Sequence, residues 1–162
     1  MKKVILITIT LLFIFLYFPK AKAFDTYVAH SALARAVAEK YNQSVVTPLT
    51  NQEIEWLVQG SLEEDEPIIR AFNHFYNPLT NEGLRVLGIP LGLPSPIWAH
   101  DSLAQGFQLG GDCSWPTAIK AYKQNDKAKG LRCLGHVLHL LQDVGVPAHT
   151  RNDQHMTGDT LE

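Results

Sequence analysis

Apolar residues recur with helical spacing along most of this 162-residue chain, and this periodicity constrains the fold more than any other feature. In the first periodic segment, one stripe of a helix contains His30, Leu33, Ala34, Val37, Ala38 and Tyr41. No stretch alternates polar and apolar residues for long enough to predict a sheet. We therefore predict an all-α fold, a compact multi-helix domain.

Local signals place the first half of these helices. Thr50 and Glu53 have the spacing of a capping box, which predicts a second helix that stops at Gly60. Pro67 suits the first turn of a third helix, which runs toward His74 and is closed by an Asn-Pro step.

Three further helices are expected in the second half, at about 97–107, from about 116 to 124, and at about 127–144. The segment 83–96 holds three glycines and three prolines, so it predicts an ordered loop packed on the surface.

The N-terminus is typical of a secretory signal peptide. Two lysines precede an uncharged apolar run, 4–18, and an Ala-Lys-Ala step ends at Ala23. We expect cleavage of residues 1–23, a mature domain of 24–162, and a secreted protein, extracellular or periplasmic, with no integral membrane span left. An uncleaved membrane anchor is the alternative.

Charge and cysteine content narrow the function classes. The predicted leader contains four lysines and no acid, so the mature chain has 10 basic and 16 acidic residues, a net charge of −6. Such a chain repels nucleic acid unless a cation is bound. Cys113 and Cys133 are the only cysteines, and in an exported chain they predict one disulfide, with free buried thiols as the alternative.

Histidine and aspartate residues stand in otherwise apolar segments. His139 and Asp143 are four residues apart, so they share a helix face and can bind one ion; a simple His–Asp hydrogen bond is the alternative. Pro147 is expected to end the regular structure just before His149. Nitrogen and carboxylate donors without paired cysteines indicate zinc, and two or three ions because the donors outnumber one tetrahedral shell. The remaining donors in structured settings are His30, Asp65 and His74.

The pattern His139-x3-Asp143-x5-His149, with "GSLEEDEP" and "NHFYNP" earlier, resembles the zinc-dependent phospholipase C and S1/P1 nuclease superfamily. Its members are secreted all-helical phosphodiesterases with a trinuclear zinc site. The resemblance implies that Asp65, His74 and His139 bind one zinc, which Asp143 bridges to a second. The second ion would also take His30 and the backbone amine and carbonyl of Phe24.

In the family, the third zinc, which His149 would bind here, takes further ligands from later in the chain. The resemblance offers His155 with Asp159, or Glu162 as the final acid. Family members continue with a further helix, so the chain resembles a C-terminally truncated member. Glu64 is the alternative ligand at the Asp65 position, and His136 could orient a ligand.

By resemblance, the expected activity is that of a secreted zinc-dependent hydrolase of phospholipase C type. It would cleave a phosphodiester, in a phospholipid headgroup or another substrate, by means of a zinc-activated hydroxide. Asp65 would be catalytic as well as metal-binding, because it could orient the attacking water. The alternatives are a single-strand nuclease of S1/P1 type, which the acidic chain disfavours, and a zinc-binding fragment without turnover.

Overall fold

The computed structural model describes residues 26–151, and within them the protein is all-α, as predicted. The predicted leader 1–23 and four candidate ligands lie outside the described residues: Phe24, His155, Asp159 and Glu162. The elements are η1 (Thr26–His30), α2 (Ser31–Asn42), α3 (Asn51–Glu63), η2 (Ile68–Asn73), β1 (Arg85–Val86), β2 (Ile89–Pro90), α4 (Ser95–Trp98), α5 (Ser102–Phe107), α6 (Trp115–Lys123), α7 (Lys127–Asp143) and α8 (Pro147–Arg151). Among the described helices, none is both long and apolar enough to cross a membrane.

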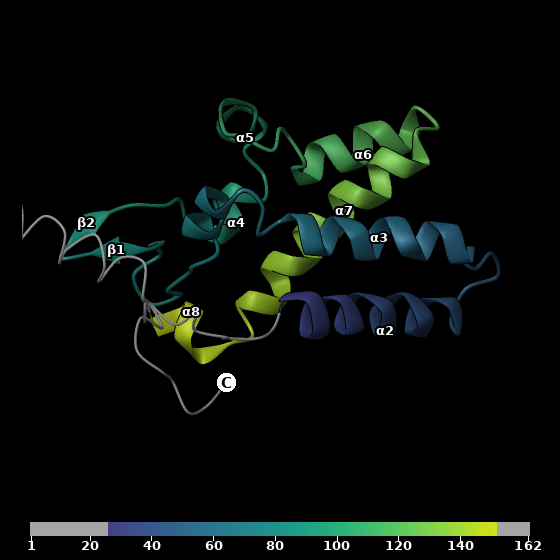
Figure 1. The fold of residues 1–162 in the computed structure, drawn as a ribbon, viewed down its shortest axis with the longest axis horizontal. Helices are drawn as coiled ribbons and strands as arrows, with labels where there is room; N and C mark the ends of the chain where they lie inside the picture. The colour runs from purple at the N-terminus through teal and green to yellow at the C-terminus, as the bar shows by residue number, and fades with distance from the viewer. Residues whose placement is uncertain (1–25, 152–162) are drawn as a thin grey trace, which may run out of the picture. The chain divides into compact units, whose positions relative to one another are not determined.

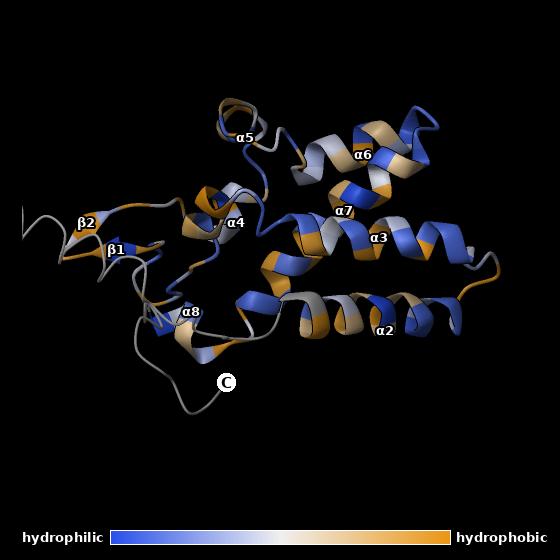
Figure 2. Ribbon diagram, viewed as in Figure 1, coloured by the Kyte–Doolittle hydropathy of each residue, from blue (hydrophilic) through white to orange (hydrophobic). Residues whose placement is uncertain are grey.

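Helix α7 is the centre of the packing. It lies against α3 and α6, while α2 packs beside α3 (Figure 1). Apolar residues recur between polar ones along these helices (Figure 2). Ala34 and Ala38 of α2 are buried against Ile54, Leu57 and Val58 of α3. The narrow buried stripe of α2 consists of small residues, so the two helices can approach closely.

The predicted capping box at the start of α3 is confirmed, but the predicted helix end at Gly60 is wrong. Thr50 accepts a hydrogen bond from the Glu53 backbone, and the Glu53 side chain accepts one from the Thr50 backbone. The helix continues to Glu63, because Gly60 serves close packing. A Cβ atom at Gly60 would lie 1.8 Å from the backbone oxygen of Arg132 in α7.

Three other expected elements differ in the structure. Pro67 precedes a 3₁₀ helix, η2, rather than an α-helix. The helix expected at 97–107 is split into α4 and α5, because the side chain of Asp101 caps a new helix by accepting a hydrogen bond from the Ala104 backbone. Pro147 begins α8 instead of ending the regular structure, since a proline in the first turn needs no hydrogen-bonding N–H.

The predicted loop at 83–96 contains a small antiparallel hairpin, β1–β2. Leu87 and Gly88 form its turn with positive φ angles of 51° and 81°. This backbone geometry suits a two-residue hairpin turn. The hairpin is too short for its alternation to show in the sequence.

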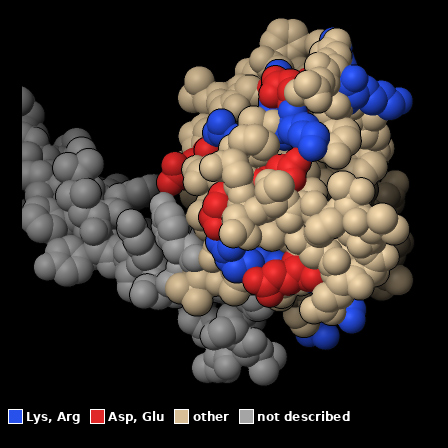
Figure 3. Space-filling view, turned by 90° about the vertical axis from the view of Figure 1, so that its right-hand side faces the viewer, with Lys and Arg blue, Asp and Glu red and all other residues tan. Residues whose placement is uncertain are grey.

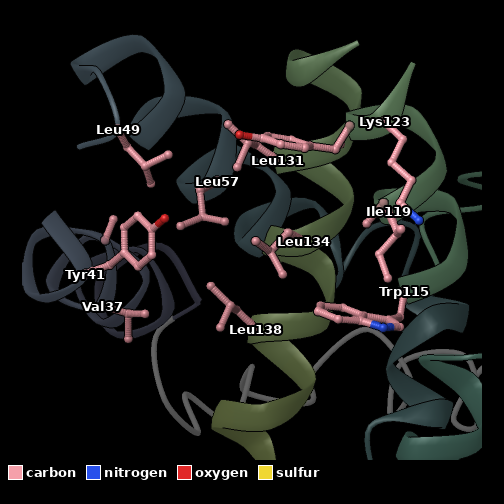
Figure 4. A pocket seen from close by; sticks show the side chains of 14 residues that line it. Val37, Tyr41, Leu49, Leu57, Trp115, Ile119, Lys123, Leu131, Leu134 and Leu138 are labelled. Atoms are coloured by element: carbon pink, nitrogen blue, oxygen red, sulfur yellow. The ribbon is translucent and has the colours of Figure 1, made fainter. Parts of the chain in front are cut away.

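The predicted disulfide is confirmed between Cys113 and Cys133. It ties the segment before α6 to the buried side of α7. On another side of α7, an apolar groove of about 460 Å³ runs between α2 and α6 (Figure 4). Val37 and Tyr41 line one wall and Trp115 and Ile119 the other.

Candidate metal centre

Segments far apart in the sequence bring six of the predicted ligands to one place. Asp143 lies in the last turn of α7, which is surrounded by the ends of other elements. The other five come from the end of η1, the turn after α3, the end of η2, α7 itself and α8: His30, Asp65, His74, His139 and His149.

The carboxylate of Asp143 is the common neighbour of the histidines. Its Oδ2 atom lies 2.8 Å from Nδ1 of His74 and 3.2 Å from Nε2 of His139. Its Oδ1 atom lies 3.4 Å from Nε2 of His30 and 3.4 Å from Nδ1 of His149. The two oxygens therefore face different sets of imidazoles, which is the arrangement of a bridging carboxylate.

Two groups of residues could each hold a metal ion. One consists of Asp65, His74 and His139, and the other of His30, His139 and Asp143; the ligand atoms within each group all lie within 4.8 Å of one another. Oδ1 of Asp65 is 3.5 Å from both His74 and His139. Because His139 belongs to both groups, the two candidate sites adjoin.

Hydrogen bonds on the far side of the rings orient two of the histidines. Nδ1 of His139 donates to the backbone oxygen of Ser61 at 2.7 Å, and Nδ1 of His30 donates to Oε1 of Gln142 at 2.6 Å. The rings of His30 and His139 stack, with centroids 3.8 Å apart. These bonds direct both Nε2 atoms toward Asp143. Metal-binding histidines are commonly oriented in this way by a hydrogen-bond partner on the other ring nitrogen, here called an outer partner.

The chemistry of this cluster fits a divalent cation. Asp143 is 1% exposed, and its Oδ2 atom, although 2.8 Å from Nδ1 of His74, makes no hydrogen bond of suitable geometry within the described part of the chain. A buried unpaired polar atom is costly, and a bound cation would satisfy it. Imidazole and carboxylate donors are those that zinc takes in proteins.

Without a metal ion, the carboxylates of the cluster stabilise the protonated form of two of its histidines. Burial lowers the pKa of His139, but Asp143 and Asp65 outweigh it and raise the pKa to about 10. For His74 burial is likewise outweighed, by Asp143 and Glu64, and the pKa rises to about 9. Burial raises the pKa of Asp143, but the adjacent His139 and His74 hold it well below its usual range. Burial and the charge of His139 lower the pKa of His30.

Asp65 and Glu64, the two alternatives for one ligand position, occupy different environments. Asp65 has a partly exposed side chain and belongs to a candidate ligand group. Glu64 is fully buried and instead binds Arg70, Trp98 and His136. His136 therefore contacts Glu64, a carboxylate beside the site, and belongs to neither of the two candidate ligand groups.

His149 lies beside the two groups without belonging to either. Its Nδ1 atom donates to the backbone oxygen of Asp143 at 3.2 Å, and its ring meets the Phe75 ring edge-on. Sequence reasoning missed the outer partners Ser61 and Gln142. Nothing in their local sequence distinguishes them, because each contacts a histidine from a distant segment.

Comparisons with known protein families, curated proteins and solved structures found no match to this chain. The case for a metal centre therefore rests on the geometry of these residues.

Proposed function

We propose that this protein is a secreted zinc-dependent phosphodiesterase, similar to the zinc-dependent phospholipase C and S1/P1 nuclease superfamily. The observation that supports this most is the placement of Asp143, whose two oxygens face two adjoining ligand groups that share His139. Adjacent metal sites of this kind are used to clamp the attacking and leaving oxygens in phosphoryl transfer.

Each side chain would have a distinct part in such a reaction. Zinc, when bound, would lower the pKa of coordinated water to near neutral and offset charge on the phosphoryl oxygens. Asp65 is the more exposed carboxylate of the cluster, so it can accept a hydrogen bond from an attacking water and orient it. His149, with 15% of its side chain exposed, lies 3.4 Å from Oδ1 of Asp143 and can supply one ligand to a further metal ion.

A phospholipid is the favoured substrate class. The formal net charge is −2 for the whole chain and −6 without the predicted leader, and the face shown in Figure 3 carries acidic and basic side chains side by side rather than a basic field. Nucleic-acid binding depends on such a field. A single-stranded nucleic acid is therefore the second substrate class to be assayed.

The test combines zinc analysis with hydrolysis. Purified protein, with its N-terminus checked by mass spectrometry, is analysed for zinc and assayed on bis(p-nitrophenyl) phosphate, phosphatidylcholine and single-stranded DNA. We expect two or three zinc ions per chain. In His139→Ala, which removes the ligand that both groups share, we expect less zinc and at least about a hundredfold slower hydrolysis.

His100→Ala is the matched control, because His100 is exposed and belongs to neither group. It should keep full zinc content and rate. Zinc without any hydrolysis would instead support a non-catalytic zinc-binding protein, and a preference for DNA would support a nuclease. Protein that binds no zinc would contradict the proposal.

A further inference from the structure

One buried carboxylate lies beside the candidate metal centre without belonging to a ligand group. Glu64 directly follows α3 and precedes Asp65, and its side chain is fully buried. We propose that Glu64 is a positioning residue, which holds the segments of Asp65 and His74 against α7 so that their ligand atoms reach His139. This inference rests on the proposed zinc site and deepens it.

Donors from three elements converge on the Glu64 carboxylate. Arg70 of η2 donates to Oε2 from Nη2 at 2.6 Å and from Nε at 3.2 Å. Trp98 of α4 donates from Nε1 to Oε1 at 2.7 Å, and Nδ1 of His136 in α7 lies 2.5 Å from Oε2. Buried charge-assisted hydrogen bonds are strong and directional. They therefore join the end of α3 to η2, α4 and α7 at a single point.

Glu64 and two of its partners, Arg70 and His136, each lie close in the chain to a candidate ligand. Asp65 is the next residue along the chain, and Arg70 lies in the short helix that leads to His74. His136 precedes His139 by one turn of α7, so it fixes the same stretch of that helix. Nε2 of His74 lies 3.7 Å from Oε1 of the carboxylate. A change at this point would shift all three members of one ligand group relative to one another.

The guanidinium of Arg70 extends the network away from the metal centre. It donates to the backbone oxygen of Gly111 at 3.1 Å and lies 5.0 Å from the centre of the Trp98 ring. A buried ion pair adds little net stability compared with apolar residues of the same shape, although breaking one partner alone is costly. The main contribution of the Glu64–Arg70 pair is therefore to fix the relative positions of α3 and η2.

The test separates positioning from stability by comparing two paired carboxylates at opposite ends of α3. Glu64→Gln is compared with Glu53→Gln, which removes a mostly buried charge paired with Lys127 at the opposite end of α3. Zinc affinity is measured by competition with a chromogenic chelator, and coordination geometry by the visible spectrum of the cobalt-substituted protein. In Glu64→Gln we expect about 10- to 100-fold weaker zinc binding and an altered cobalt spectrum. In Glu53→Gln we expect lower stability with unchanged zinc affinity and spectrum.

A double variant, Glu64→Gln with Arg70→Met, keeps the inference testable if the single variant does not fold. It leaves no unpaired buried charge, so it should regain stability without regaining zinc affinity. Wild-type affinity in Glu64→Gln, or recovery of affinity in the double variant, would overturn the positioning role while zinc binding by the wild type still stands. A wild-type protein without zinc would overturn the proposed function and this inference together.

Discussion

At the scale of single residues, the cluster combines two carboxylates, those of Asp65 and Asp143, with several imidazoles in a mostly buried space. Without a metal, the pKa of His74 rises to about 9 and that of His139 to about 10. In the metal-free protein at pH 7, both histidines are therefore in the positively charged imidazolium form, with a proton on each ring nitrogen. Zinc binds only the neutral imidazole, so the protons must leave when zinc enters.

We predict that zinc binding at pH 7 releases about two protons, one from each of these histidines. Since both pKa values lie above 7, apparent zinc affinity should rise with pH between 7 and about 9, by up to about a hundredfold per pH unit. Calorimetry in two buffers with different ionisation enthalpies measures the release. The variant His139→Ala should release about one proton fewer, and a release near zero in the wild type would contradict the prediction.

At the scale of elements, the crossing of α3 and α7 positions the centre. Gly60 and Gly135 let the two backbones approach so closely that a Cβ atom would lie 1.8 Å or 2.1 Å from a backbone oxygen of the other helix. Ser61, next to Gly60, accepts the hydrogen bond that orients His139. The close approach of α3 and α7 therefore brings the backbone oxygen of Ser61 within hydrogen-bonding distance of His139.

Gly60→Ala should lower the free energy of unfolding by about 2–3 kcal/mol, because the added methyl group meets backbone rather than a movable side chain. Urea unfolding of the metal-free protein measures the loss. Gly106→Ala is the control: Gly106 is in α5, and a Cβ atom there meets nothing within 4 Å, so this change should be neutral or stabilise by up to about 1 kcal/mol. Equal stability of the two variants would rule out the close-packing role.

At the scale of the whole described domain, a cross-link and a central helix hold together segments that are distant in sequence. The disulfide closes a separation of 20 residues between the start of the α6 region and α7. Cys133 lies almost two turns of α7 before His139, the nearer candidate ligand, and neither cysteine belongs to a ligand group. The cross-link should therefore contribute to stability without entering the metal chemistry.

Replacing both Cys113 and Cys133 with alanine should lower the free energy of unfolding by about 3 kcal/mol, as expected for a loop of this length. Zinc content per folded chain should remain at the wild-type value. Denaturant unfolding with and without reductant provides the control, because reductant should weaken the wild type and leave the variant unchanged. A variant as stable as the oxidised wild type would show that the cross-link contributes nothing.

Several features could be predicted from the sequence because their physical cause is local. Helical periodicity predicted the all-α fold, and the capping box at Thr50 depends on two residues three positions apart. The extent of α7 was also predicted, since its apolar and polar residues follow one helical period. The disulfide was predicted because the chain contains only two cysteines and was expected to be exported to an oxidising environment.

Other features depend on contacts between distant segments, and only the tertiary structure decides them. Gly60 looks like a helix end until α7 lies against it, and Asp65 and Glu64 look equivalent until Arg70 and Trp98 surround one of them. The sequence by itself determined that the fold is all-α and which side chains are candidate metal ligands. The tertiary structure decided that Asp65 joins a candidate ligand group and that Glu64 is held by an arginine, because burial and pairing depend on neighbours that no local pattern specifies.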